Sequence, residues 1–462
     1  MGIMEPDPKK PLLLFTSFPA EGHTGPLLAI AKHMVLQNYP VVYVSNLSRK
    51  DKITSLGAEL IEAEYGFAEM TGVDGDAEEQ ILLEAVPVRI KRQYSLLADI
   101  VFNSMGQRVD AVESALELLR RREPVRQIIV VEDIVNMSTM PYRHGRALPA
   151  GFDKMPKTVG ISTHPLMRHS RDTGPFLLGL PPDATDSGRL RNTALNDLVV
   201  LGPMQPLLEA WAEAMLKCGC ATVTDGNPIS AMYDYHDATL MLCSPSLEYP
   251  MSDLPSRLHF VGCLPHRGVD SKTVYPGWWP EVSQAHTRGI KAVFVSQGTF
   301  NIKDMNELII PTLTALAGRE DVLVIATLGA KGAQLDLAYP VPANARVTDY
   351  IPYDAILPYT SVFVSNAGYG AFGHAVMNGV PAVFAGETED KLEVAKRAEW
   401  AGFAYNVDTQ TPSPEQVRHG VDTVLANDAY KKRALELKEE NEAMDALTRI
   451  ESHIASFAEM NL

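Results

Sequence analysis

The chain has 462 residues, too many for one ordinary hydrophobic core, so we expect two domains of roughly 200 to 250 residues each. Hydrophobic residues make up 46% and charged residues 21%, the balance of a globular enzyme rather than of a disordered chain. The formal net charge of -16 argues against nucleic acid or an anionic membrane as a partner, because both attract basic patches.

The N-terminal residues MGIMEPDPKK are polar and lack the order of a signal peptide, and no apolar run approaches the roughly 20 residues that cross a bilayer. The four cysteines are too few for a disulfide framework, and Cys218-Gly219-Cys220 has no second close pair at zinc spacing. The sequence therefore predicts a cytoplasmic protein with free thiols, no transmembrane segment and no bound metal.

The first predicted unit is a βαβ unit, with strands over residues 11–17 and 40–45 and a helix over 27–37. His23 lies in the loop FPAEGHTGP that joins the first strand to the helix, where open α/β sheets place ligands. A polar loop residue that caps or packs is the alternative interpretation of His23. A further strand over 127–131 ends in Glu132 and Asp133, a pair that alone is typical of a solvated loop or helix cap.

The rest of the chain divides into predicted domains at polar segments. Residues 1–264 form a first Rossmann-like domain, and the Pro-rich and Gly-rich loop over 168–192 lies over its mouth. Residues 265–288 form a polar linker. Residues 289–440 form a second Rossmann-like domain, which opens with a strand ending in Ser296, and 441–462 form a final amphipathic helix.

The stretch over residues 345–406 is the most informative about function. It reads as strand, short helix, strand, glycine turn, helix, strand, acidic loop and helix. A strand over 361–365 leads into Asn366-Ala367-Gly368-Tyr369-Gly370 and then a helix to about Met377. Backbone amides at such a helix start bind phosphate, since glycine allows close approach and the helix dipole favours negative charge.

Two classes of nucleotide site fit this turn. Gly368, Gly370 and Gly373 spell GxGxxG, and acidic residues including Asp390 follow about 20 residues later, as an NAD(P)-dependent oxidoreductase requires. A nucleotide-sugar site is the other class. A glycine turn that only packs helix on sheet is the structural alternative.

The surrounding motifs favour the nucleotide-sugar site. Tyr350-Ile351-Pro352 precedes the turn, Gly379-Val380-Pro381 opens the next strand, and Glu389-Asp390-Lys391 follows that strand. This order resembles the donor signature of the inverting UDP-glycosyltransferases, which runs W-x-P-Q, H-C/G-G-x-N-S, G-V-P and D/E-Q. The resemblance implies the GT-B fold: two facing Rossmann-like domains with parallel sheets, an interdomain cleft, and the final helix packed back on the first domain.

The resemblance also assigns donor residues. Tyr350 would stack on uracil, Ile351 would offer its backbone to the base edge, and His374 would meet the ribose. Asp390 and Lys391 would hold the sugar hydroxyls. The diphosphate would lie against Ser296, Thr299, Asn366, Gly368, Tyr369, Gly370 and Ala371.

Four of these positions depart from the family pattern: Tyr350 for Trp, Asn366 for His, His374 for Glu and Lys391 for Gln. Asn366 and His374 retain hydrogen-bonding groups for phosphate and ribose. Because Lys391 carries an ammonium group in place of an amide, the pattern does not fix the identity of the donor sugar. We expect UDP-glucose, with UDP-glucuronate as the alternative. The departures also allow a catalytically silent nucleotide-sugar binding protein.

In the first domain, the loop around His23 resembles the family's G-H-x-x-P loop, whose histidine is the general base. The resemblance implies that Asp133 orients His23, with Glu132 as the alternative because neighbouring strand residues face opposite sides. We expect a monomeric enzyme that transfers the sugar with inversion at its anomeric carbon and needs neither a metal nor a resident cofactor. Small lipophilic or phenolic acceptors, such as a polyketide, flavonoid or sterol, would contact Phe18, Phe67, Met137 and Phe176.

Overall fold

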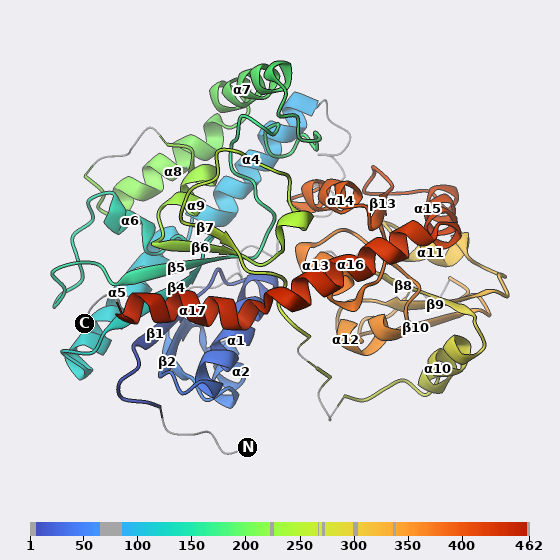
Figure 1. Cartoon of the computed structure of the whole chain (residues 1–462), viewed down its shortest axis with the longest axis horizontal. Coiled ribbons are helices and arrows are strands. Elements are labelled where there is room, and N and C mark those ends of the chain that lie inside the picture. The colour runs from blue at the N-terminus through green and yellow to red at the C-terminus, as the bar shows by residue number, and fades with distance from the viewer. Residues whose placement is uncertain are drawn as a thin grey trace.

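The computed structural model describes residues 6–64, 86–221, 226–266, 268–269, 273–298, 304–335 and 339–459. Within these ranges the chain forms a seven-stranded sheet and a six-stranded sheet, whose strand pairs are all parallel. Figure 1 shows the two sheets side by side, each covered by helices. The predicted pair of Rossmann-like domains is confirmed. Phe67 and Thr299 lie outside the described residues.

The first sheet has the strand order β3-β2-β1-β4-β5-β6-β7. Every residue of its two central strands is buried, because helices cover both faces, and both strands are rich in aliphatic residues. The order reverses between β1 and β4, so their carboxyl ends lie together at the switch point where open sheets bind ligands. The strands are β1 (Leu12–Thr16), β2 (Val41–Ser45), β3 (Glu59–Glu62), β4 (Ile128–Asp133), β5 (Lys157–Ser162), β6 (Ala238–Met241) and β7 (Leu258–Phe260).

The first helix starts earlier than the sequence predicts. Helix α1 spans Glu21–Leu36, so His23 lies in its first turn and not in a loop. Pro26 within the helix, which lacks an amide hydrogen, and two nearby glycines masked this start. The other helices of this domain are α2 (Lys50–Ser55), α4 (Val86–Phe102), α5 (Met105–Arg122), α6 (Met140–Arg143), α7 (Asp186–Leu201), α8 (Gln205–Lys217) and α9 (Pro228–Asp234).

The second sheet has the order β10-β9-β8-β11-β12-β13 and its own switch point between β8 and β11. The strands are β8 (Lys291–Ser296), β9 (Val322–Thr327), β10 (Ala345–Thr348), β11 (Val362–Ser365), β12 (Ala382–Phe384) and β13 (Ala404–Asn406). The helices are α10 (Trp279–Thr287), α11 (Ile309–Ala315), α12 (Tyr353–Ile356), α13 (Tyr369–Asn378), α14 (Lys391–Trp400) and α15 (Pro414–Ala426). Helix α10 lies inside the predicted linker, where Val282 and Ala285 are buried, so that segment is not wholly irregular.

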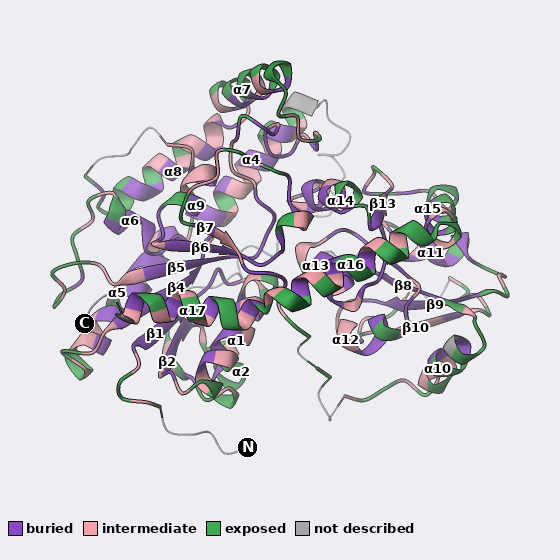
Figure 2. Ribbon diagram, in the orientation of Figure 1, coloured by how far each residue is buried: buried purple, intermediate pink, exposed green. Residues whose placement is uncertain are grey.

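The last two helices join the domains. Helix α16 (Asp428–Met444) packs on α13, whereas α17 (Ala446–Glu459) packs on α1 of the first domain. Ile450, Ile454 and Phe457 of α17 are buried in the same hydrophobic cluster as strands of the first sheet. Figure 2 shows that buried residues fill both sheets while exposed residues lie on the outer helices. In the described part of the chain, no helix is both long and apolar enough to cross a membrane.

Candidate active site

His23 and Asp133 meet at the switch point of the first sheet. Asp133 is the last residue of β4 and is fully buried, while His23 stands in the first turn of α1, after β1. His23 Nδ1 lies 2.8 Å from Asp133 Oδ2, and the His23 side chain is 24% exposed. Because the carboxylate accepts the hydrogen on Nδ1, Nε2 of the neutral imidazole is left as a proton acceptor.

Two further groups fix this pair. The Phe18 amide donates to Asp133 Oδ2 at 3.3 Å, and the Thr163 hydroxyl donates to Asp133 Oδ1 at 3.3 Å. Burial acts to lower the pKa of His23, but the Asp133 carboxylate outweighs it and raises that pKa above 6.5. Burial also acts to raise the pKa of Asp133, yet His23 and the Phe18 amide hold it below 3.8.

Glu132, the alternative partner, does not face His23. Its carboxylate accepts hydrogen bonds from Ser138, Thr139 and Asn136, and it is fully buried among them. Burial raises the pKa of Glu132 despite these hydrogen bonds. The alternation of side chains along β4 therefore assigns the contact with His23 to Asp133.

In the second domain, the ends of β8 and β11 also lie side by side. Asn366 Nδ2 donates to the Gln297 backbone carbonyl, and Asn366 Oδ1 is buried with no hydrogen-bond partner among the described residues. The Ser296 hydroxyl lies 2.8 Å from the Tyr353 hydroxyl and accepts from the Gly298 amide at 3.2 Å. These contacts hold the two strand-end turns together in front of α13.

The glycine turn leads into the N-terminus of α13, where Gly368 is the N-cap. The left-handed conformation falls on Ala367, with φ of 63°, and not on the motif glycines. A Cβ added to Gly370 or Gly373 would meet nothing within 4 Å, so both face open space. No acidic residue lies in the first turn, which leaves the positive end of the helix dipole free for an anion.

Gly386, which the sequence analysis missed, joins this turn to α14. A Cβ at Gly386 would lie 2.3 Å from the Asn366 carbonyl oxygen and 2.9 Å from Lys391 Cβ. Only glycine permits that approach. In the sequence, Gly386 is only a single glycine shortly after β12, and its position there does not reveal its contact with Asn366.

Charged residues gather at the start of α14. Lys391 is buried, donates to Thr388 Oγ1 at 2.9 Å and pairs with Glu389 at 2.9 Å. Burial and the Glu389 carboxylate raise the pKa of Asp390 to about 6, against the opposing influence of Lys391 and His23. The Asp390 carboxylate also contributes to the raised pKa of His23, so these two groups interact electrostatically across the domains.

The remaining predicted donor residues follow the same edge of the second sheet. Tyr350 is 43% exposed just after β10, whereas Ile351 beside it is buried. His374 Nδ1 lies 2.9 Å from Asp354 Oδ1. Ala371 is buried in the first turn of α13, and the Tyr369 ring stacks on Phe372, so Tyr369 offers the turn its backbone and not its ring.

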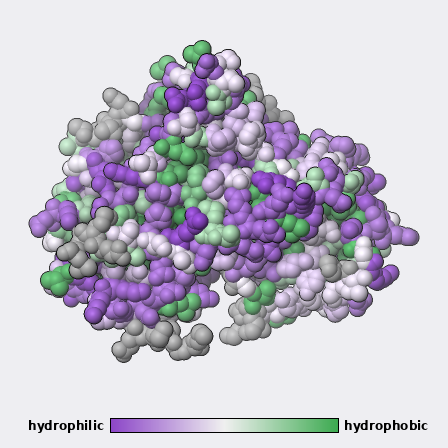
Figure 3. All heavy atoms as spheres, viewed as in Figure 1, coloured by the Kyte–Doolittle hydropathy of each residue, from purple (hydrophilic) through white to green (hydrophobic). Residues whose placement is uncertain are grey.

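Of the predicted acceptor residues that the structure describes, Phe18 is the one brought into contact with His23, at 5.3 Å between ring centroids in an edge-to-face arrangement. Met137 and Phe176 are buried in the large hydrophobic cluster that also includes residues of α4. Figure 3 shows apolar residues gathered near the centre of the face drawn. Phe18 thus gives His23 an apolar neighbour in the first domain.

Comparison with known proteins agrees with this geometry. Residues 312–455 match the family model described as Erythromycin biosynthesis protein CIII-like, C-terminal domain. UDP-glucosyltransferase 1 of Beauveria bassiana (strain ARSEF 2860) is 34% identical over 446 residues, covering 96% of this chain and 94% of that protein. UDP-glucosyltransferase B1 of Starmerella bombicola is 31% identical over 460 residues, covering 97% and 99%.

Solved structures share the whole fold at low sequence identity. The glycotransferase of kitacinnamycin aligns with a TM-score of 0.69 at 18% identity, covering 98% of this chain and 100% of that chain. The glycosyltransferase VinC, solved in complex with DTDP, aligns with a TM-score of 0.63 at 18% identity, covering 97% and 100%. These neighbours confirm the predicted GT-B arrangement.

Proposed function

From the premise that this chain belongs to the UDP-glycosyltransferase family, we propose that it moves glucose from UDP-glucose to a hydroxyl of a small lipophilic or phenolic acceptor, with inversion. The observation that supports this most is the His23–Asp133 pair, in which the buried carboxylate lies 2.8 Å from Nδ1 of the imidazole. A histidine oriented by a carboxylate is suited to deprotonate a hydroxyl held between the domains.

The proposed reaction is a single displacement. His23 Nε2 takes the proton of the acceptor hydroxyl as its oxygen attacks the anomeric carbon, and the bond from that carbon to the UDP oxygen breaks. Asp133 stabilises the imidazolium that forms, since it contacts Nδ1 at 2.8 Å. Attack from the face opposite the leaving group inverts the anomeric centre.

The departing diphosphate gains negative charge, which the start of α13 is placed to stabilise. The helix presents its dipole and the amides that follow Gly368, with no acidic side chain in the first turn. We propose that these groups suffice without a metal. We further propose that Tyr350, which is exposed after β10, covers the base, and that His374, whose ring contacts Asp354, meets the ribose.

The charges near the sugar support a neutral hexose. Lys391 is paired with Glu389, and Asp390 adds a second carboxylate, so two acids accompany one ammonium. A uronate would add a further carboxylate to this acidic group, which Coulomb repulsion disfavours. The names of the two fungal relatives, both UDP-glucosyltransferases, agree with glucose. The buried free thiols favour a reducing, cytoplasmic compartment, and we propose a monomer.

The test is UDP release from UDP-glucose, UDP-galactose and UDP-glucuronate in the presence of a panel of phenols. We expect UDP-glucose to give the highest kcat/KM and the NMR coupling of the product's anomeric proton to show inversion. Binding of UDP without release from any donor would instead indicate a silent nucleotide-sugar binding protein. Thermal stabilisation by NAD or NADP, and not by UDP, would favour the oxidoreductase alternative.

A further inference from the structure

Glu393 lies in the first turn of α14, and its two carboxylate oxygens bind different partners. Oε1 accepts the backbone amides of Leu177 at 3.0 Å and Gly179 at 3.1 Å, both from the first domain. Oε2 accepts from Arg397 Nη1 at 2.7 Å, one helical turn further along the same helix. The Glu393 side chain is only 6% exposed, so it links the two domains inside the protein.

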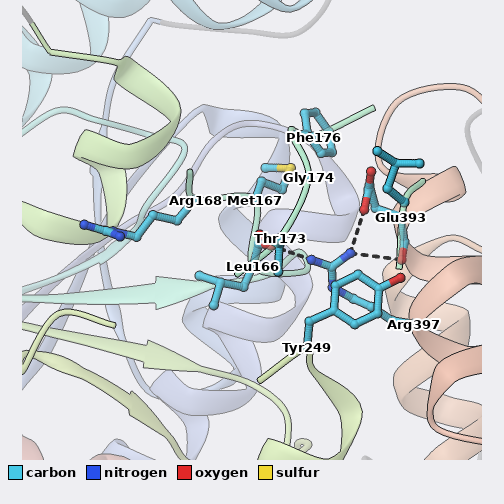
Figure 4. A pocket seen from close by; sticks show the side chains of 10 residues that line it. Leu166, Met167, Arg168, Thr173, Gly174, Phe176, Tyr249, Glu393 and Arg397 are labelled. Carbon is cyan, nitrogen blue, oxygen red and sulfur yellow. Dashed lines mark hydrogen bonds and ion pairs between the residues drawn. The ribbon is translucent and has the colours of Figure 1, made fainter. Parts of the chain in front are cut away.

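Arg397 is fixed in turn by the first domain. Its Nε donates to both Glu248 oxygens, at 2.9 and 2.8 Å, and its Nη2 donates to the Leu166 carbonyl at 2.6 Å. The guanidinium carbon also lies 4.4 Å from the centroid of the Tyr249 ring. Figure 4 shows Arg397 beside Tyr249, pointing toward Glu393. The buried network therefore holds Glu393 in one orientation.

Residues 177–179, two of whose amides bind Glu393, have an unusual backbone conformation. Leu177 has φ of 78°, a left-handed conformation that a leucine keeps only when its surroundings hold it. Gly179 has φ of 59°, and a Cβ there would lie 3.1 Å from Leu392 of α14. Phe176, which directly precedes Leu177 and is a predicted acceptor residue, is buried.

The same helix begins at the proposed sugar site. Asp390, one of the two residues expected to hold the sugar hydroxyls, is the N-cap of α14 and precedes Glu393 by three residues, a rise of about 4.5 Å along the helix. The segment from Phe176 to Gly179 thus contacts α14 about one helical turn beyond Asp390. The adjacent cavity, lined by Phe176, Glu393 and Arg397 among others, has a volume of about 10 Å³, which suits a water molecule and not a ligand.

Resting on the proposed function, we propose that Glu393 is a positioning residue for the acceptor. Through Oε1 it holds the backbone of Leu177 and Gly179. This contact fixes the position of Phe176 and its neighbours relative to the donor domain, so that they form one wall of the acceptor site. Glu393 itself touches neither substrate. Its loss should therefore weaken acceptor use while leaving the nucleotide site intact.

The experiment compares Glu393→Ala, Glu393→Gln and the exposed control Glu399→Gln on the same helix, with full-length protein. Acceptor KM and kcat are measured with a small phenol and a polycyclic phenol, and UDP binding is measured by thermal shift. We expect Glu393→Ala to raise the acceptor KM on the order of 10-fold or more, with kcat within about threefold and the UDP-induced shift unchanged. Glu399→Gln should match wild type.

Glu393→Gln separates positioning from stability. Its side-chain carbonyl can still accept the amides of Leu177 and Gly179, while its amide faces Arg397. We expect a lower melting temperature but an acceptor KM near wild type. An unchanged KM in Glu393→Ala, or an equal rise in both variants, would overturn the proposal. Absence of transfer by wild type would instead count against the proposed function.

Discussion

At the scale of single residues, the chemistry depends on which nitrogen of His23 carries the proton. Asp133 contacts Nδ1, so Nε2 is the atom available to take a proton from an acceptor. The same carboxylate raises the pKa of His23, which makes the imidazole a stronger base but requires a higher pH to keep it neutral. Burial opposes this effect and limits it.

Asp133→Asn should change both the rate and its pH dependence. In wild type, kcat/KM should fall on the acid side with a midpoint above pH 6.5, since the pKa of His23 is raised. Removing the carboxylate leaves burial as the main influence, so the midpoint should move to lower pH. The plateau should fall by a factor on the order of 10² or more, because the imidazolium loses its partner. Transfer rates measured from pH 5 to 9 check both effects.

Glu132→Gln is the matched control for that change. Glu132 accepts hydrogen bonds from Ser138 and Thr139 and has no contact with His23, so the acid midpoint should stay where it is in wild type. The buried donors lose part of their acceptor, and we expect a loss of about 1 to 3 kcal/mol in the free energy of unfolding. A shift of the midpoint in this variant, with none in Asp133→Asn, would reverse the assignment.

At the scale of elements, the donor site is built from the ends of neighbouring strands. The GxGxxG motif predicted α13, although the helix begins at Tyr369 and not after Gly370, and the reason for its glycines differs from the expectation. Ala367, and not a motif glycine, takes the left-handed conformation, while Gly370 faces open space. The glycine that the packing requires is Gly386, on the turn after the next strand.

Alanine at Gly386 and at Gly370 should therefore differ in its effect on stability. Gly386→Ala would place a Cβ 2.3 Å from the Asn366 carbonyl oxygen, so we expect destabilisation of about 1 to 3 kcal/mol and weaker UDP binding. Gly370→Ala meets no protein atom within 4 Å and should keep the wild-type melting temperature. UDP should nevertheless stabilise Gly370→Ala less, because the added methyl group stands where the diphosphate would approach.

Thermal melts with and without UDP measure both variants. Equal loss of stability in the two proteins would contradict the packing role of Gly386. An unchanged UDP effect in Gly370→Ala would contradict the placement of the diphosphate at α13.

At the scale of the whole molecule, both sheets place their functional residues at their switch points, and α17 returns to the first domain. The strand pattern predicted the two Rossmann-like domains because buried parallel strands appear as short aliphatic runs. His23, Asp133 and the turn at Asn366 each follow such a run, but it was the resemblance to the family that assigned roles to His23 and Asp133. Phe176 was named, but the hydrogen bonds from the neighbouring Leu177 and Gly179 to Glu393 join positions more than 200 residues apart, which no local pattern encodes.

The start of α1 and the helix α10 were missed for a local reason. Pro26 and the glycines near His23 weaken helical propensity, yet packing against the sheet overrides it. In α10, prolines and polar residues conceal two buried positions, Val282 and Ala285. The predicted domain limits at 264, 288 and 440 remain predictions.

Buried histidines should make the protein sensitive to acid. His236 is fully buried, with neither ring nitrogen hydrogen-bonded among the described residues, and burial lowers its pKa to about 3. Since the unfolded value is about 6.5, the unfolded chain binds the proton more readily. Stability from neutral His236 is thus fully present above pH 6.5 and is lost as the pH falls toward 3, by about 2 kcal/mol at pH 5.

Chemical unfolding at pH 7.5 and pH 5.0 tests this contribution in wild type and His236→Phe. The ring of His236 packs on Gly160, where Phe keeps an aromatic ring without a titrating group. Wild type should lose more stability than the variant between the two pH values. Equal losses would show that His236 does not contribute, whatever the other titrating groups do.

The most direct test of the central claim is UDP release by wild type and His23→Ala, with saturating UDP-glucose and a phenolic acceptor. We predict that the variant binds UDP as wild type does but loses turnover by a factor on the order of 10² to 10⁴, because the proton acceptor is gone. Normal turnover in His23→Ala would contradict the account, since the hydroxyl would then be activated by another group.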